Sequence, residues 1–247
     1  MGIATFEKTD DRSLFLKMHP QVSQDGIWTA YTANDKSNIY IARLGSESPR
    51  KLAGEPKGIV WDWSFDNTRL LFTKLPDWSL SQLDVASGRQ SLFLRKAGYN
   101  LYQAKFAPDG RAVGLIGCDA QRSGMGCRIF VVPLKGDGSP EAEGWAEVDH
   151  SSPWDDKPRW SPGSGTIYFI SDRDGHYCLW SQTLNCATKR PAGKPAPLYH
   201  FHNSRLAMIN VGTGLLEIDV ARDKIVTGLG ELTGNIWRLK RGENRVD

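Results

Sequence analysis

Residues 157–175, KPRWSPGSGTIYFISDRDG, decide the fold of this chain. A short strand ends at Trp160, a turn follows at Ser161–Ser164, an apolar strand runs from Thr166 to Ser171, and a second turn closes on Gly175. Gly and Pro mark such turns because Gly tolerates a positive φ and Pro presets its own φ. The order strand, turn, strand, turn within so few residues predicts antiparallel β-structure.

The first of these turns recurs along the whole chain, each time after one short strand and before a second, apolar strand. The turns span residues 23–26, 64–67, 107–110, 161–164 and 221–224, at spacings of 41, 43, 54 and about 60 residues. A period of about 40 to 45 residues that holds several strands is typical of propeller blades. We therefore expect an all-β fold, a β-propeller of four-stranded antiparallel blades with about five repeat units.

The repeats divide a single propeller domain, residues 1–247, into five units. Their approximate bounds are 18–58, 59–100, 101–153, 154–203 and 204–247. The fifth unit ends after its third strand, but the N-terminal strand 12–17 nearly copies residues 90–95, the outermost strand of the second unit. Strand 12–17 is thus expected to complete the last blade and close the ring, which removes two exposed sheet edges. The alternative is an incomplete, larger propeller.

Composition and charge narrow the function classes. The chain has 25 Gly and 13 Pro but no sustained helical spacing of apolar residues, so few helices are expected. The net charge is only +3 and the basic residues are scattered, which argues against nucleic-acid binding. No apolar run reaches the roughly 20 residues of a membrane span, and the first residues lack an apolar signal-peptide core. A soluble chain is expected, in a compartment that the sequence leaves open.

The first strands of the five units align in two informative columns. Side chains in successive strand positions point to opposite faces, so one column should pack between blades and the other should face the central channel. The packing column is Val22, Trp63, Phe106, Trp160 and Val220. The axial column is Gln21, Asp62, Lys105, Arg159 and Asp219. Its opposite charges sit in adjacent units, so the ring is either self-compensated or a binding site.

Two stretches also carry a family resemblance. Residues 157–162 with 166–175, and residues 106–110 (FAPDG), resemble the TolB-type, WD40-like (PD40) propeller repeat. The C-terminal stretch 231–237 is similar to the last blade of bacterial propellers that follow a protein kinase or a winged-helix regulator. The resemblance implies a non-catalytic protein- or peptide-binding module, a scaffold or sensor in a larger signalling protein. Propellers of this type usually have six blades, and five units are visible here.

The sequence shows no catalytic constellation, and in particular no G-x-S-x-G nucleophile elbow. We therefore expect a binding protein rather than an enzyme, with a protein or peptide partner. Aromatic and acidic residues in turns and at strand starts are the second group of candidate binding residues, because aromatics dominate binding hot spots. They are Trp78, Tyr102, Trp154, Asp155 and Asp156. The alternative is a propeller glycoside hydrolase that uses Asp155, Asp156 or Asp62, since such enzymes need paired carboxylates.

The cysteines and histidines give weaker signals. Cys118 and Cys127 flank a predicted hairpin, where directly opposed positions allow a disulfide, and the sequence leaves both redox states open. No C-x-x-C pair is present, so zinc is disfavoured. His200 and His202 share one face of the expected outer strand, where a packed or solvated pair is favoured over a metal site. No metal and no cofactor are expected, and the oligomeric state is left open.

Overall fold

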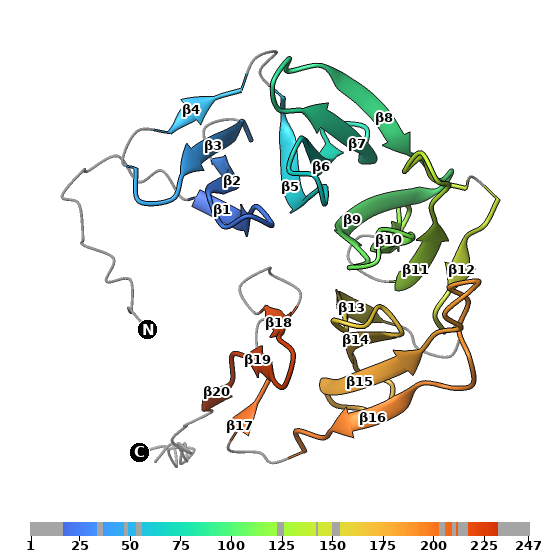
Figure 1. Ribbon diagram of the computed structural model, residues 1–247. Coiled ribbons are helices and arrows are strands. Elements are labelled where there is room, and N and C mark those ends of the chain that lie inside the picture. Colours follow the sequence, from blue (N-terminus) through green and yellow to red (C-terminus); the bar gives the residue numbers. More distant parts are fainter. Residues whose placement is uncertain are drawn as a thin grey trace, which may run out of the picture.

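The computed structural model describes residues 17–33, 37–46, 49–52, 56–122, 126–141, 143–149, 154–202, 206–208, 211 and 217–231. Regular structure in these ranges is almost entirely β-strand. Four antiparallel, four-stranded sheets stand around a common centre as the blades of a propeller (Figure 1). The predicted all-β propeller is thereby confirmed. Within the same ranges, no helix has the length and apolarity needed to cross a membrane.

Each blade pairs its four strands in chain order, with the first strand nearest the centre (Figure 1). The first blade contains β1 (Lys17–Val22), β2 (Trp28–Ala33), β3 (Ile39–Arg43) and β4 (Arg50–Lys51). The second contains β5 (Gly58–Trp63), β6 (Arg69–Lys74), β7 (Ser79–Asp84) and β8 (Gln90–Leu94). The third contains β9 (Tyr99–Phe106), β10 (Ala112–Asp119), β11 (Cys127–Pro133) and β12 (Ala146–Glu147). The fourth contains β13 (Asp155–Trp160), β14 (Thr166–Ser171), β15 (Cys178–Thr183) and β16 (Ala196–Tyr199).

The fifth unit is smaller than the other four in the described residues. It consists of two short ribbons, β17 (Leu206–Ala207) with β20 (Gly230–Glu231) and β18 (Ile218–Val220) with β19 (Ile225–Thr227). Figure 1 places it between the fourth and the first blade, with β18 towards the centre. Its predicted third strand, 235–238, and residues 12–16 of the predicted closing strand lie outside the described residues, while Lys17 begins β1.

The turn after the inner strand differs in chemistry from unit to unit. In the first blade the Ser23 hydroxyl donates to Asp25 at 2.5 Å and accepts the Trp28 amide at 2.9 Å. Ser64 does the same in the second blade with Asp66 and Arg69. The fifth unit has Ala221 in place of this serine. The third blade likewise has Ala107 at this position and still forms four strands, so the serine is not required for a complete blade. In the fifth unit the Ala221 amide donates to the Lys224 carbonyl.

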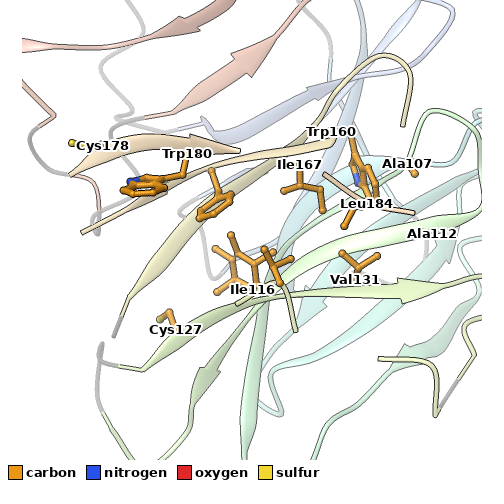
Figure 2. Packing of buried hydrophobic residues seen from close by; sticks show 13 residues of the cluster. Ala107, Ala112, Ile116, Cys127, Val131, Trp160, Ile167, Cys178, Trp180 and Leu184 are labelled. Atoms are coloured by element: carbon orange, nitrogen blue, oxygen red, sulfur yellow. The ribbon is translucent and has the colours of Figure 1, made fainter. Parts of the chain in front are cut away.

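The hydrophobic core is divided into four clusters, one at each boundary between consecutive units. Trp63 and Trp160 are buried, and each indole donates to a carbonyl on the inner strand of the preceding blade, at 2.9 Å. Figure 2 shows the cluster between the third and fourth blades, with Trp160 and Ile167 packed near Val131. These clusters hold the blades together because large aromatic side chains bury much apolar area.

The packing column is thus only partly as predicted. Trp63 and Trp160 are buried, Phe106 and Val220 are half-buried, and Val22 is 52% exposed. The prediction is wrong for Val22 in the described part of the chain. The two tryptophans pack against the preceding blade, and for Val22 the preceding unit is the fifth, which is the smallest.

The register of the third blade answers the question that the sequence left open about two cysteines. Cys118 on β10 stands directly opposite Cys127 on β11, with Cα atoms 4.0 Å apart, and the two form a disulfide. Cys178 and Cys186 are free thiols, the former buried and the latter exposed. The disulfide fastens the end of the β10–β11 hairpin beside the half-buried Tyr102.

The turn carboxylates predict how stability depends on pH. The Ser23 hydroxyl bond lowers the pKa of Asp25 below 3.8, and the Ser87 hydroxyl bond does the same to the pKa of Asp84. A carboxyl whose pKa is lower in the folded state stabilises the fold above its unfolded value, and this contribution disappears as the pH falls through the folded pKa. Urea midpoints should therefore decrease from about pH 4 downwards. The double variant Asp25→Asn/Asp84→Asn should show a shallower decrease, and equal slopes would contradict this account.

The disulfide should contribute measurably to stability. Replacing both Cys118 and Cys127 by Ser should lower the free energy of unfolding by about 2 to 3 kcal/mol, because the bond restricts the unfolded chain. Urea unfolding measures the effect, and Cys186→Ser, at an exposed free thiol, is the control that should change nothing. Thiol labelling of the denatured wild type should modify two cysteines without reductant and four with it. Labelling of all four without reductant would exclude the bond.

Candidate functional site

The structure places the axial column at the centre of the ring. Gln21, Lys105, Arg159 and Asp219, from β1, β9, β13 and β18, line a cavity of ≈ 300 Å³ that we call the axial cavity. Its other lining residues are His19, Pro20, Trp61, Gln103, Glu217 and Ile218. Asp62 on β5 lies next to it and forms an ion pair with Lys105, with Nζ and Oδ1 3.7 Å apart. Residues from all five units thus meet at one polar cavity.

Ion pairs and hydrogen bonds connect these side chains around the ring. Lys105 contacts the Gln21 side-chain oxygen as well as Asp62. Asp62 also accepts the Phe106 amide at 2.9 Å, so a carboxylate of the second blade is tied to the backbone of the third. The partner of Arg159 is Glu217, with Nη2 and Oε2 2.5 Å apart, and not the neighbouring Asp219 that the columns suggested.

Sequence reasoning missed a second column that faces the axis. It lies two residues before the axial column and consists of His19, Val60, Gln103, Lys157 and Glu217. Of these, His19, Gln103 and Glu217 line the axial cavity, whereas Val60 is buried in the core cluster between the first and second blades. A signal was available, because four of these five residues are polar within otherwise buried strands. Lys157 is 1% exposed and forms ion pairs with Asp156 at 3.7 Å and Glu217 at 3.8 Å.

Three residues of this second column have a strained backbone. His19, Gln103 and Lys157 have φ values of 52°, 49° and 56°, in the left-handed region that residues other than glycine rarely adopt. Each lies at an irregularity in the pairing of the inner strand with its neighbour. Such bulges redirect side chains, and here they add His19 and Gln103 to the lining of the axial cavity.

A second cavity adjoins the first. It has a volume of ≈ 470 Å³, and we call it the rim cavity. Trp61 and Gln103 line both cavities, while Tyr102, Trp154 and Asp156 line only the rim cavity. The disulfide of Cys118 and Cys127 forms part of its wall. Three of the five predicted turn and strand-start residues are therefore together at one cavity.

The other two of that group have structural contacts. Trp78 packs against Tyr102, which lines the rim cavity, with ring centroids 5.3 Å apart. Asp155 is 1% exposed and accepts the Arg173 guanidinium at 3.1 Å. Asp155 and Asp156 are neighbours in β13, but successive strand side chains point to opposite faces, so only Asp156 lines the cavity.

Gln103 stands at the junction of the two cavities with one polar atom unsatisfied. Its amide nitrogen donates to Asp156 at 2.8 Å, which orients the amide. Its oxygen, Oε1, is buried and accepts no hydrogen bond from any described residue. Buried polar atoms are nearly always paired, so an unpaired acceptor on a residue that lines both cavities is a candidate contact for a ligand that donates an N–H or O–H.

Burial also shifts the pKa of three ionisable groups at this centre. It lowers the pKa of Lys105, against the opposing effect of Asp62, and it lowers the pKa of His19. It raises the pKa of Asp156, against the opposing effect of Lys157. In each case loss of water disfavours the charged form. The charged forms of these groups are thus poorly hydrated.

Comparison with known proteins finds solved structures of similar fold. No protein-family model matches the chain, and no curated protein matches it. Among solved structures, a putative TolB from Agrobacterium tumefaciens superposes with a TM-score of 0.61 at 16% identity, over 88% of this chain and 78% of that chain. TolB from Acinetobacter baumannii gives a TM-score of 0.59 at 16% identity, over 88% of this chain and 52% of that chain.

An enzyme shares the same architecture. A puromycin hydrolase variant in complex with PGG gives a TM-score of 0.64 at 14% identity, over 88% of this chain and 36% of that chain. The present chain spans about half of the A. baumannii TolB and about a third of this hydrolase. At such identities the likeness concerns the fold alone. The chain has the β-propeller fold that TolB proteins and propeller-containing enzymes share.

Proposed function

We propose that this chain is a non-catalytic module that binds a protein loop or peptide at the rim and axial cavities. The observation that carries the proposal is the buried, unpaired Gln103 oxygen at the junction of the two cavities. A peptide supplies a backbone N–H every residue, and a chain that lies across the rim cavity can direct one of them to this oxygen.

The surroundings suit a peptide in two further respects. Tyr102 and Trp154 offer aromatic surface in the rim cavity, and such residues dominate the binding energy of protein interfaces. In the axial cavity, Lys105 and Arg159 face Glu217 and Asp219, so both signs of charge are present. We infer that the ligand inserts a polar side chain or a chain end at the axis and rests its apolar part on the rim.

The alternative, a glycoside hydrolase, has less support. It needs two carboxylates on opposite sides of one bond. Of the three candidates, Asp156 lines the rim cavity, and burial raises its pKa as a general acid would require. However, Asp155 is held by Arg173, and Asp62 is held by Lys105 and the Phe106 amide. The candidate carboxylates serve the structure of the blades, which favours binding over hydrolysis.

The resemblance of the repeats to TolB-type sequences supports the same proposal. We propose further that the module works as a scaffold or sensor within a larger signalling protein. Its partner is a protein or peptide, and neither nucleic acid nor membrane insertion is part of the proposal.

A random-sequence peptide display library tests the proposal directly. Selection against the wild-type chain should enrich peptides with a shared motif. Synthetic copies should bind at least about tenfold more weakly to the Gln103→Leu variant and to the double variant Lys105→Glu/Arg159→Glu, because both remove groups at the axis. Titration calorimetry measures the affinities, and thermal unfolding shows whether each variant is folded.

The matched control is a charge reversal away from the cavities. Lys224→Glu changes a side chain that is 62% exposed and lines neither cavity, and it should leave the affinity unchanged. Tyr102→Ala tests the rim alone and should weaken binding with little effect on the axial charges. Enrichment of peptides whose affinity none of the folded axial or rim variants alters would refute the location of the site. Hydrolysis of a polysaccharide that Asp156→Asn abolishes would refute the non-catalytic assignment.

A further inference from the structure

Four metal-ligating side chains meet at the edge of the fourth blade, outside both cavities. Asp174 lies in the turn between β14 and β15, and Cys178 is the first residue of β15. His200 and His202 follow directly after β16. The oxygen, sulfur and nitrogen atoms that these residues can offer as ligands all lie within 4.8 Å of one another.

Strand register explains why residues so far apart in sequence come together. Leu179 on β15 pairs with Tyr199 on β16, so the residues after Tyr199 pass beside Cys178. The Phe201 amide donates to the Cys178 sulfur at 3.4 Å and fixes this approach. His200 and His202 flank Phe201, and both turn to the same side.

The carboxylate of Asp174 holds both imidazoles in place. His200 Nδ1 lies 2.7 Å and His202 Nε2 lies 3.0 Å from the same Asp174 oxygen. The ring centroids of His200 and His202 are 4.7 Å apart, and the ring centroid of His176 lies 4.5 Å from that of His202. The potential ligand atoms of the cluster thus lie within reach of a common centre.

We propose that Asp174, Cys178, His200 and His202 bind a divalent cation of the zinc class. Bonds of about 2.0 to 2.3 Å in a tetrahedral zinc site put ligand atoms roughly 3.3 to 3.8 Å apart, and the observed cluster differs from this by about 1 Å. Two imidazole nitrogens, one thiolate and one carboxylate are the donors that zinc prefers. Calcium and magnesium take mostly oxygen ligands, so a set with one carboxylate does not suit them.

The exposure of the two histidines would allow a cation to enter the cluster from solvent. The side chains of His200 and His202 are 44% and 46% exposed, while Cys178 is 0% exposed. Figure 2 shows Cys178 at one end of the packed cluster, near Trp180. The sulfur therefore forms the floor of the site, and the two imidazoles and the carboxylate form its open side.

The position of the site gives the ion a structural effect. Phe201, between the two histidines, packs against the cluster of Met208, Val211 and Ile218 that joins the fourth blade to the fifth unit. An ion that fixes residues 200–202 against β15 would hold Phe201 in this boundary. Binding of Zn²⁺ should therefore stabilise the attachment of the smallest unit of the ring, by linkage between binding and folding.

Titration of the chelator-treated, disulfide-intact protein tests the site. Zn²⁺ should bind with one equivalent in calorimetry and raise the Tm by several degrees. Co²⁺ should give the intense d–d absorption of a tetrahedral site together with a thiolate charge-transfer band. His200→Ala and His202→Ala, at exposed positions, should each weaken Zn²⁺ binding at least about tenfold. Cys178→Ala should abolish the charge-transfer band.

Three controls separate this site from adventitious binding. His176→Ala removes a neighbouring imidazole outside the proposed ligand set and should retain one equivalent of Zn²⁺. Cys186→Ser and the double variant Cys118→Ser/Cys127→Ser remove the remaining sulfurs and should retain the cobalt spectrum. The proposal is overturned if Co²⁺ gives no tetrahedral spectrum, or if the affinity for Zn²⁺ is the same in wild type, His200→Ala and His202→Ala. It does not depend on the proposed function, since none of the four proposed ligands lines the rim or axial cavity.

Discussion

The ring depends on hydrogen bonds that two buried tryptophans donate to the inner strands at its centre. In two places an indole N–H of one blade donates to a backbone carbonyl on the inner strand of the preceding blade: Trp63 to Gln21, and Trp160 to Lys105. The same residues that accept these bonds through their carbonyls present their side chains to the axial cavity. Packing between the blades therefore also fixes the positions of the axial side chains. A shift of either tryptophan would move Gln21 or Lys105.

Hydrogen bonds at the turns and near the axis also join neighbouring blades, at the two ends of the inner strands. The amide of Gln24 donates to Asn67 at 2.7 Å, and the amide of Asp109 donates to Ser164 at 3.0 Å, so the first turn is tied to the second and the third turn to the fourth. Near the axis, Asp62 accepts the Phe106 amide and joins the second blade to the third. The blades are thus coupled by polar bonds at turn and axis and by apolar packing between them.

Much of the fold could be predicted from the sequence because it rests on a repeat. The turn with its Ser and Asp, and the alternation before it, sufficed to locate the inner strands and to place Gln21, Lys105 and Arg159 near one another. Alternation could not show that Val22 would be exposed, because that depends on how large the neighbouring unit is. The pairing of Arg159 with Glu217 rather than Asp219 depends on the β-bulges. A bulge inserts an extra residue into the strand and so changes the direction of the side chains next to it.

The cluster of Asp174, Cys178, His200 and His202 was hidden for a related reason. Three of its members lie outside regular strands, and the register between β15 and β16 shifts between Leu179 and Trp180. A sequence shows which residues are in a strand more readily than which residues face each other across two strands. Local pattern therefore found the pair of histidines but neither the cysteine nor the aspartate that face them.

Three residues near the axis have a strained backbone, which bears on the proposed binding role of the centre. A positive φ at a residue other than glycine costs roughly 1 to 3 kcal/mol, and His19, Gln103 and Lys157 each have one. Val60 occupies the same column in the second blade and is not among the residues with positive φ, so the architecture itself does not require the strain. What the strain achieves is the direction of the side chains: His19 and Gln103 line the axial cavity, and Gln103 brings an unpaired oxygen to its wall. Strain that the fold does not require, at a residue whose polar atom has no partner, is the arrangement expected of a binding site.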